Sequence, residues 1–152
     1  MSEPSKVSVK LEVDNHNQWF VSILIKIGNI SKPVRFRVDT GCNAVVLSHS
    51  TLKKLGLDTS EANLAKLPEI SGALASGNNH KFRKLGKVSL HKGNKQFTHI
   101  CTAEAICHAT HETNDLLGTE AFRQQAPSEF ATELCPIGGY DVHWTSFKGN
   151  RF

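Results

Sequence analysis

The chain has 152 residues, a length that suits one domain and is too short for two lobes. Of these residues 39% are hydrophobic and 21% charged, as is usual for a soluble globular protein. No apolar run reaches the roughly 18 residues that span a bilayer. The first residues, 1–6, lack the apolar core of a secretion signal, so we expect an intracellular protein. The net charge is +4, but the basic residues are scattered rather than interleaved with aromatic ones, which argues against nucleic acid as a partner.

The N-terminal third of the chain has the pattern of three strands and a short helix. Apolar and polar residues alternate over 7–14 and 34–39, and 19–27 is apolar and β-branched, as expected for strands with a buried face. Turn residues at 14–18 and 28–29 separate these strands, and the third strand runs directly into Asp39. Residues 48–55 have helical spacing, with Ser48 as N-cap and Gly56 as the stop.

The remainder of the chain continues this mostly-β pattern. Residues 69–90 contain two short runs around the turn residues 76–79, which indicates a hairpin. Residues 97–106 predict another strand, a second short helix is expected from Thr119 to before Pro127, and Val142 and Trp144 indicate a last strand. Many short strands with two small helices predict a β-sandwich or β-barrel domain.

The residues with the clearest chemical meaning are Asp39, Thr40 and Gly41, at the end of the third strand. Gly41 has no Cβ, so a second backbone can approach the carboxylate, and the Thr40 hydroxyl can bond to another copy of the same loop. Two carboxylates about 3 Å apart share one proton, and such a pair can activate a water molecule while it protonates a peptide carbonyl. One chain supplies one such loop, so a complete pair requires two chains.

Two motifs in this order make the chain resemble the retropepsins, the aspartic proteases of retroviruses, retrotransposons and some cellular proteins. The first motif is 37–42, with the sequence Arg-Val-Asp-Thr-Gly-Cys. The second is 114–122, about 75 residues downstream, with Leu-Leu-Gly at 116–118. Residues 73–78 and 85–88 between them are similar to the flap hairpin and its return strand.

The resemblance implies a closed β-barrel or sandwich protomer with a flap hairpin and one or two short helices, forming a two-fold homodimer. The whole chain, 1–152, is then one protease domain, with its core at about 7–145. It implies an endopeptidase that cleaves an extended, polyprotein-like peptide in the cytoplasm or inside a retroelement particle, with neither cofactor nor metal.

The resemblance also implies the site residues. The catalytic group is Asp39, Thr40 and Gly41, and residues 116–118 pack behind the active-site loop. The residues expected to line the substrate are Cys42, Asn43, Ala44, Ala75, Ser76, Gly77 and Asn78.

The chain departs from the retroviral pattern at several places, and its flap has fewer glycines than retroviral flaps. Cys42 replaces a smaller residue, Asn43 and Ala44 stand where carboxylates often occur, and 140–152 has no counterpart. The same fold without hydrolysis, as a peptide-binding or dimerisation module, is the alternative function.

Two other segments imitate functional motifs. Leu-Asp-Thr-Ser at 57–60 resembles a second catalytic loop, but it follows a helix and lacks the glycine, so we interpret Asp58 as a residue at the exit of the helix. Cys101, Cys107, His108 and His111 suggest a zinc site, but their spacing does not match the common ligand pairs. We expect both cysteines to be small buried hydrophobic residues.

Overall fold

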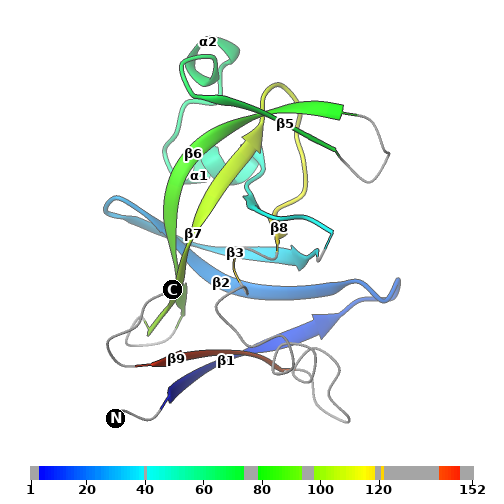
Figure 1. The fold of residues 1–152 in the computed structure, drawn as a ribbon, viewed down its shortest axis with the longest axis vertical. Coiled ribbons are helices and arrows are strands. Elements are labelled where there is room, and N and C mark those ends of the chain that lie inside the picture. Colours follow the sequence, from blue (N-terminus) through cyan, green and yellow to red (C-terminus); the bar gives the residue numbers. More distant parts are fainter. Residues whose placement is uncertain are drawn as a thin grey trace.

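The computed structural model describes residues 4–39, 41–73, 79–93, 98–118, 121 and 141–147. These residues form nine strands and two helices (Figure 1). In chain order they are β1 (Pro4–Val13), β2 (Trp19–Ile27), β3 (Ile30–Val38), β4 (Val45–Val46), α1 (His49–Lys54), α2 (Glu61–Leu64), β5 (Glu69–Ala73), β6 (Asn79–Lys92), β7 (Thr98–His108), β8 (Leu116–Leu117) and β9 (Asp141–Phe147).

Six of the strands close into a barrel in the order β6–β7–β4–β8–β3–β2. The ring closes where β2 pairs with β6, which sets Ile25 opposite Leu90. Strand β5 extends the sheet beyond β6, and β1 and β9 extend it beyond β2. Figure 1 shows β1 and β9 together at one end of the molecule and the β5–β6 hairpin with α2 at the other. The predicted mostly-β barrel is therefore confirmed.

The core follows from the alternation of side chains along the strands. In β2 the buried residues are Val21, Ile23 and Ile25, and in β3 they are Val34 and Phe36. Strand β7 buries small residues at alternate positions from Cys101 to Cys107, where they face a crowded interior. Full burial of each large aliphatic or aromatic side chain stabilises the fold by about 1.5–3 kcal/mol.

The short helix α1 forms as the sequence predicts. The Ser48 hydroxyl accepts a hydrogen bond from the Thr51 amide at 3.1 Å, and Gly56 follows the helix with φ of +84°. Few residues other than glycine adopt this left-handed conformation without strain. Neither helix in the described part of the chain is long and apolar enough to cross a bilayer.

Some elements differ from the sequence-based expectations. Helix α2 was not predicted; it has only four residues and is capped by Ser60. Asp58 lies in the exposed link between α1 and α2, where its carboxylate accepts a hydrogen bond from the Ser60 amide at 2.9 Å. The helix expected from Thr119 lies, apart from Ala121, outside the described residues.

Candidate active site

Asp39 follows β3 directly and is held in place by β8. The parallel pairing of β3 with β8 sets Val38 beside Leu117. The Arg37 amide donates to the Asp115 carbonyl at 2.9 Å, and the Asp39 amide donates to the Leu117 carbonyl at 3.0 Å. Backbone hydrogen bonds on both sides of Val38 therefore fix the orientation of the backbone at Asp39.

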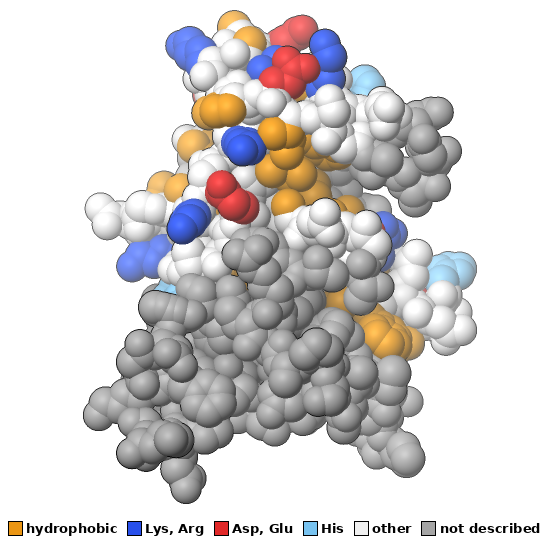
Figure 2. Space-filling model, in the orientation of Figure 1, with side chains coloured by type: hydrophobic (Ala, Val, Ile, Leu, Met, Phe, Trp, Pro, Cys, Tyr) orange, Lys and Arg blue, Asp and Glu red, His pale blue; other side chains and the backbone are white. Residues whose placement is uncertain are grey.

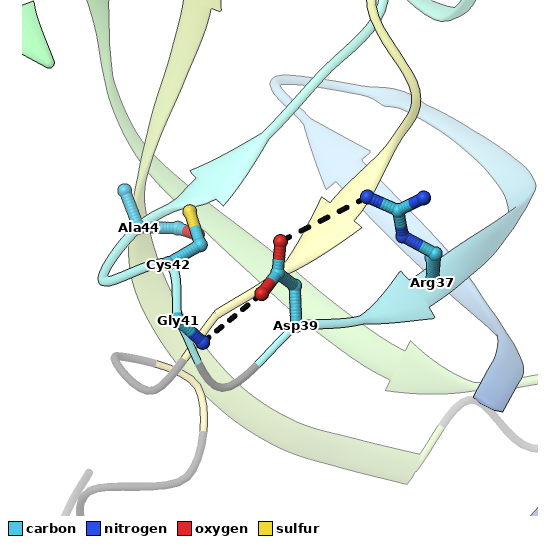
Figure 3. Close-up of polar contacts among 5 residues, drawn as sticks. All are labelled: Arg37, Asp39, Gly41, Cys42 and Ala44. Carbon is cyan, nitrogen blue, oxygen red and sulfur yellow. Dashed lines mark hydrogen bonds and ion pairs between the residues drawn. The ribbon is translucent and has the colours of Figure 1, made fainter. Parts of the chain in front are cut away.

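The turn after β3 orients the Asp39 carboxylate (Figure 3). The Gly41 amide donates to Asp39 Oδ1 at 3.0 Å, and the Cys42 amide donates to the Asp39 carbonyl at 3.1 Å. The Asp39 side chain is 31% exposed, and its Oδ2 lies 3.9 Å from Nη2 of Arg37. The carboxylate is thus positioned by a backbone donor and remains accessible to a ligand. Thr40, the other predicted member of this group, lies outside the described residues.

Two glycines allow this loop to form. A Cβ at Gly41 would lie 3.3 Å from Asp39 Oδ1, tighter than an ordinary contact. A Cβ at Gly118 would lie 2.5 Å from the carbonyl oxygens of both Cys42 and Ala44. The buried Gly118 therefore supports the backbone of the loop that carries Asp39, and a side chain there would displace it.

The predicted substrate-lining residues after Gly41 differ in exposure. Asn43 is exposed, whereas Cys42 and Ala44 are half-buried. The Cys42 thiol donates to the Ala44 carbonyl at 3.4 Å. Burial raises the pKa of this thiol, with the negative charge of Asp39 acting in the same direction, so Cys42 is a neutral thiol beside the carboxylate.

The two arms of the predicted flap hairpin are present as β5 and β6. They pair antiparallel from Glu69 opposite Arg83 to Ala73 opposite Asn79. The residues between the arms include Ala75, Ser76, Gly77 and Asn78, which were expected to contact substrate and lie outside the described residues.

A hydrophobic cluster lies between the flap arms and the barrel. Val46 of β4, Phe82 of β6 and Leu116 of β8 are buried together. The partly buried residues packed against them are Cys42, Ile70 and Ile106. Figure 2 shows hydrophobic side chains gathered on the face next to β5. An extended peptide needs apolar surface of this kind for its alternate side chains.

Asp115 is a structural residue that the sequence analysis did not single out. Its carboxylate accepts from the Ser48 amide at 2.7 Å and from the Thr51 hydroxyl at 2.8 Å. It therefore joins the segment before β8 to the start of α1. A charged residue directly before two buried leucines was the signal in the sequence, because such a residue needs partners when it is partly buried.

Several histidines form a cluster at the base of the flap, around His108. His108 is 3% exposed, and its Nδ1 accepts from the amides of Thr110 at 3.1 Å and His111 at 2.9 Å. Its Nε2 lies 3.0 Å from Nδ1 of His80. Because Nδ1 of His108 accepts two bonds, its proton is on Nε2, and this N–H donates to His80. Among the described residues no group of side chains is arranged to hold a metal ion.

The cysteines of the candidate zinc motif are buried thiols. Cys101 and Cys107 are both fully buried in β7. Burial raises the pKa of Cys107 to about 11. These residues therefore behave as the small hydrophobic core residues that the sequence predicted.

Known proteins share this fold and part of this sequence. Residues 23–95, which include the Asp39 loop and both flap arms, match the family described as aspartyl protease. A solved retropepsin-like aspartic protease from Rickettsia conorii superposes with a TM-score of 0.54 and 16% sequence identity, over 96% of each chain. No curated protein matches the sequence.

A single barrel with a flap hairpin is thus the fold that this chain shares with the retropepsin-like protease. The chain therefore has a retropepsin-like fold, as its two motifs predicted, and its residues 23–95 are similar to the aspartyl protease family.

Proposed function

We propose that the protein is an aspartic endopeptidase that hydrolyses extended, polyprotein-like peptides at a site formed by two copies of the chain. The observation that carries this proposal is the Asp39 carboxylate, which follows β3 directly, is oriented by the Gly41 amide and stays accessible. The proposal is further supported by the retropepsin-like fold and by the flap arms β5 and β6.

In the proposed reaction the two Asp39 carboxylates share one proton. The ionised carboxylate takes a proton from water, whose oxygen attacks the carbonyl carbon, while the protonated carboxylic acid donates to the carbonyl oxygen. The resulting tetrahedral intermediate collapses when its C–N bond breaks: the nitrogen receives the proton that was taken from water, and the other carboxylate takes back a proton from a hydroxyl of the intermediate. The products are a carboxylic acid and an amine, and no cofactor takes part.

The substitution Asp39→Asn tests this mechanism. The amide oxygen of asparagine can still accept from the Gly41 amide, so the loop should keep its conformation, whereas the amide cannot act as a general base. Cleavage of a decapeptide mixture, read by mass spectrometry, should fall to the uncatalysed background.

Asp58→Asn is the matched control, because it alters a carboxylate in the exposed link after α1 and should cleave like the wild type. Hydrolysis retained by a pure Asp39→Asn preparation would contradict the mechanism. A wild-type protein that binds the peptides without cleaving them would favour the peptide-binding module instead.

A further inference from the structure

Arg37 lies on the same face of β3 as Asp39. Val34 and Phe36 are buried in the barrel, so the alternate residues Arg35, Arg37 and Asp39 point to the other side. The Arg37 side chain is 26% exposed, and its Nη2 is 3.9 Å from Asp39 Oδ2 (Figure 3). This separation is too long for a hydrogen bond, so the ion pair leaves the N–H donors of Arg37 unused by Asp39.

A cavity of about 270 Å³ opens beside this pair. It lies between the start of β2, the end of β3 and the segment that precedes β8. The lining residues are Gln18, Phe20, Arg35, Arg37, Thr113, Asn114 and Asp115. A cavity of this size is large enough for one amino-acid side chain.

The polar groups of the cavity favour an anion. Arg35 stacks on the Phe20 ring, with its Cζ 3.7 Å from the centre of the ring. This contact holds a second guanidinium group at the wall of the cavity. The carboxylate of Asp115 is already bonded to Ser48 and Thr51. The buried hydroxyl of Thr113 has no hydrogen-bond partner among the described residues.

We propose that Arg37 determines specificity by binding an acidic side chain of the peptide substrate in this cavity. The inference rests on the proposed function, since the cavity lined by Arg37 would then hold a side chain of the substrate near the scissile bond. A guanidinium binds a carboxylate through two parallel N–H donors, a geometry that an amide or an ammonium group on the substrate does not match. Its positive charge also offsets the repulsion between that carboxylate and Asp39.

The test uses the intact protein and synthetic decapeptide mixtures with Glu, Gln or Lys fixed at one central position at a time. Cleavage is read by mass spectrometry, and binding is read by competition in fluorescence anisotropy. At one position the wild type should prefer Glu over Gln by about tenfold, the effect of one charged hydrogen-bonded pair. Arg37→Leu should bring this ratio close to one, and Arg37→Glu should favour Lys.

Two further variants serve as controls. Arg37→Lys keeps the charge without the planar fork and should retain part of the preference. Lys32→Leu removes an exposed cation from the same strand, away from the cavity, and should keep the wild-type ratio.

Each contrary result has a distinct meaning. If Arg37 acted only on Asp39, Arg37→Leu would change the cleavage of all three peptides by the same factor, and the unchanged ratio would overturn the inference. A wild type without acidic preference in either readout would also overturn it. Failure of the proposed function would appear separately, as no cleavage of any peptide, and the anisotropy ratio would still decide the role of Arg37.

Discussion

At Gly118 the loop that carries Asp39 leaves no room for a side chain. The missing side chain of Gly118 leaves space for the carbonyl oxygens of Cys42 and Ala44, each 2.5 Å from the place of a Cβ. These obstacles are backbone atoms, which cannot rotate away as a side chain can. The conformation of the loop that carries Asp39 therefore depends on Gly118. The two residues are 79 positions apart in the sequence, and the fold brings them together.

We predict that Gly118→Ala destabilises the protein by about 1–3 kcal/mol, the usual cost of overpacking a buried site. The midpoint of urea unfolding measures the change. Gly93→Ala is the control, because a Cβ there would make only ordinary contacts with Leu24, at 3.4 Å or more. Equal unfolding midpoints for the two variants would show that residues 42–44 yield more easily than the geometry indicates.

At the scale of elements, the flap arm β6 and the helix α1 meet at the buried His108 of β7. Its ring contacts Phe82 and His80 of β6, and its carbonyl lies 2.7 Å from Nε2 of His49 in α1. His111 stacks on it with ring centres 4.8 Å apart. The contact between flap base and barrel therefore depends on a histidine that must stay neutral to accept its backbone bonds.

We predict that the protein loses stability as the pH falls through about 6.5, the value at which an unfolded histidine takes up a proton. The pKa of His108 lies below its ordinary value because burial disfavours the charged ring, and His111, His80 and His49 act in the same direction. The unfolded chain thus binds the proton first, and the contribution of His108 to stability is full above this pH and is lost below it. Urea unfolding at about pH 7.5 and about pH 5.5 measures the difference.

His108→Phe identifies the source of this pH dependence. Phenylalanine keeps the contact with Phe82, but it can neither accept a hydrogen bond nor take up a proton. The variant should therefore be less stable at neutral pH, and its stability should depend less on pH. A residual dependence should remain, because burial also lowers the pKa values of His91 and His99. His16→Gln, in an exposed turn, is the control. A His108→Phe variant as pH-dependent as the wild type would contradict the assignment.

For the whole molecule, the proposed reaction needs a second carboxylate beside Asp39, and the other described aspartates lie elsewhere in the fold. Among the other aspartates whose side chains are described, Asp14 lies in the turn after β1 and Asp58 in the link after α1. The carboxylate of Asp115 is bonded to α1. None of these described groups can complete a pair with Asp39.

We predict that proteolytic activity per chain falls on dilution, because the active fraction follows a mass-action equilibrium between monomer and dimer. In an equimolar mixture with Asp39→Asn, random pairing should lower the activity per wild-type chain to about half. Activity assays beside analytical ultracentrifugation measure both effects. Constant activity per chain in a solution that sediments as monomer would contradict the two-chain site.

The sequence by itself determined the features that depend on neighbouring residues. The apolar, β-branched composition of residues 19–27 located β2, and the cap at Ser48 with the stop at Gly56 located α1. The loop at Asp39 was recognisable because a strand, a carboxylate and a glycine are consecutive in the chain. Helix α2 was missed, since four residues carry almost no periodic signal.

Only the tertiary structure decided which distant residues meet. Alternation tells which face of a strand is buried, but it does not give the neighbouring strand or the register. The pairing of β2 with β6, the parallel pairing of β3 with β8 and the approach of Gly118 to residues 42–44 therefore appear only in the folded chain. The bond between His80 and His108 and the cavity beside Arg37 arise for the same reason, because each joins segments whose separation along the sequence leaves no local pattern.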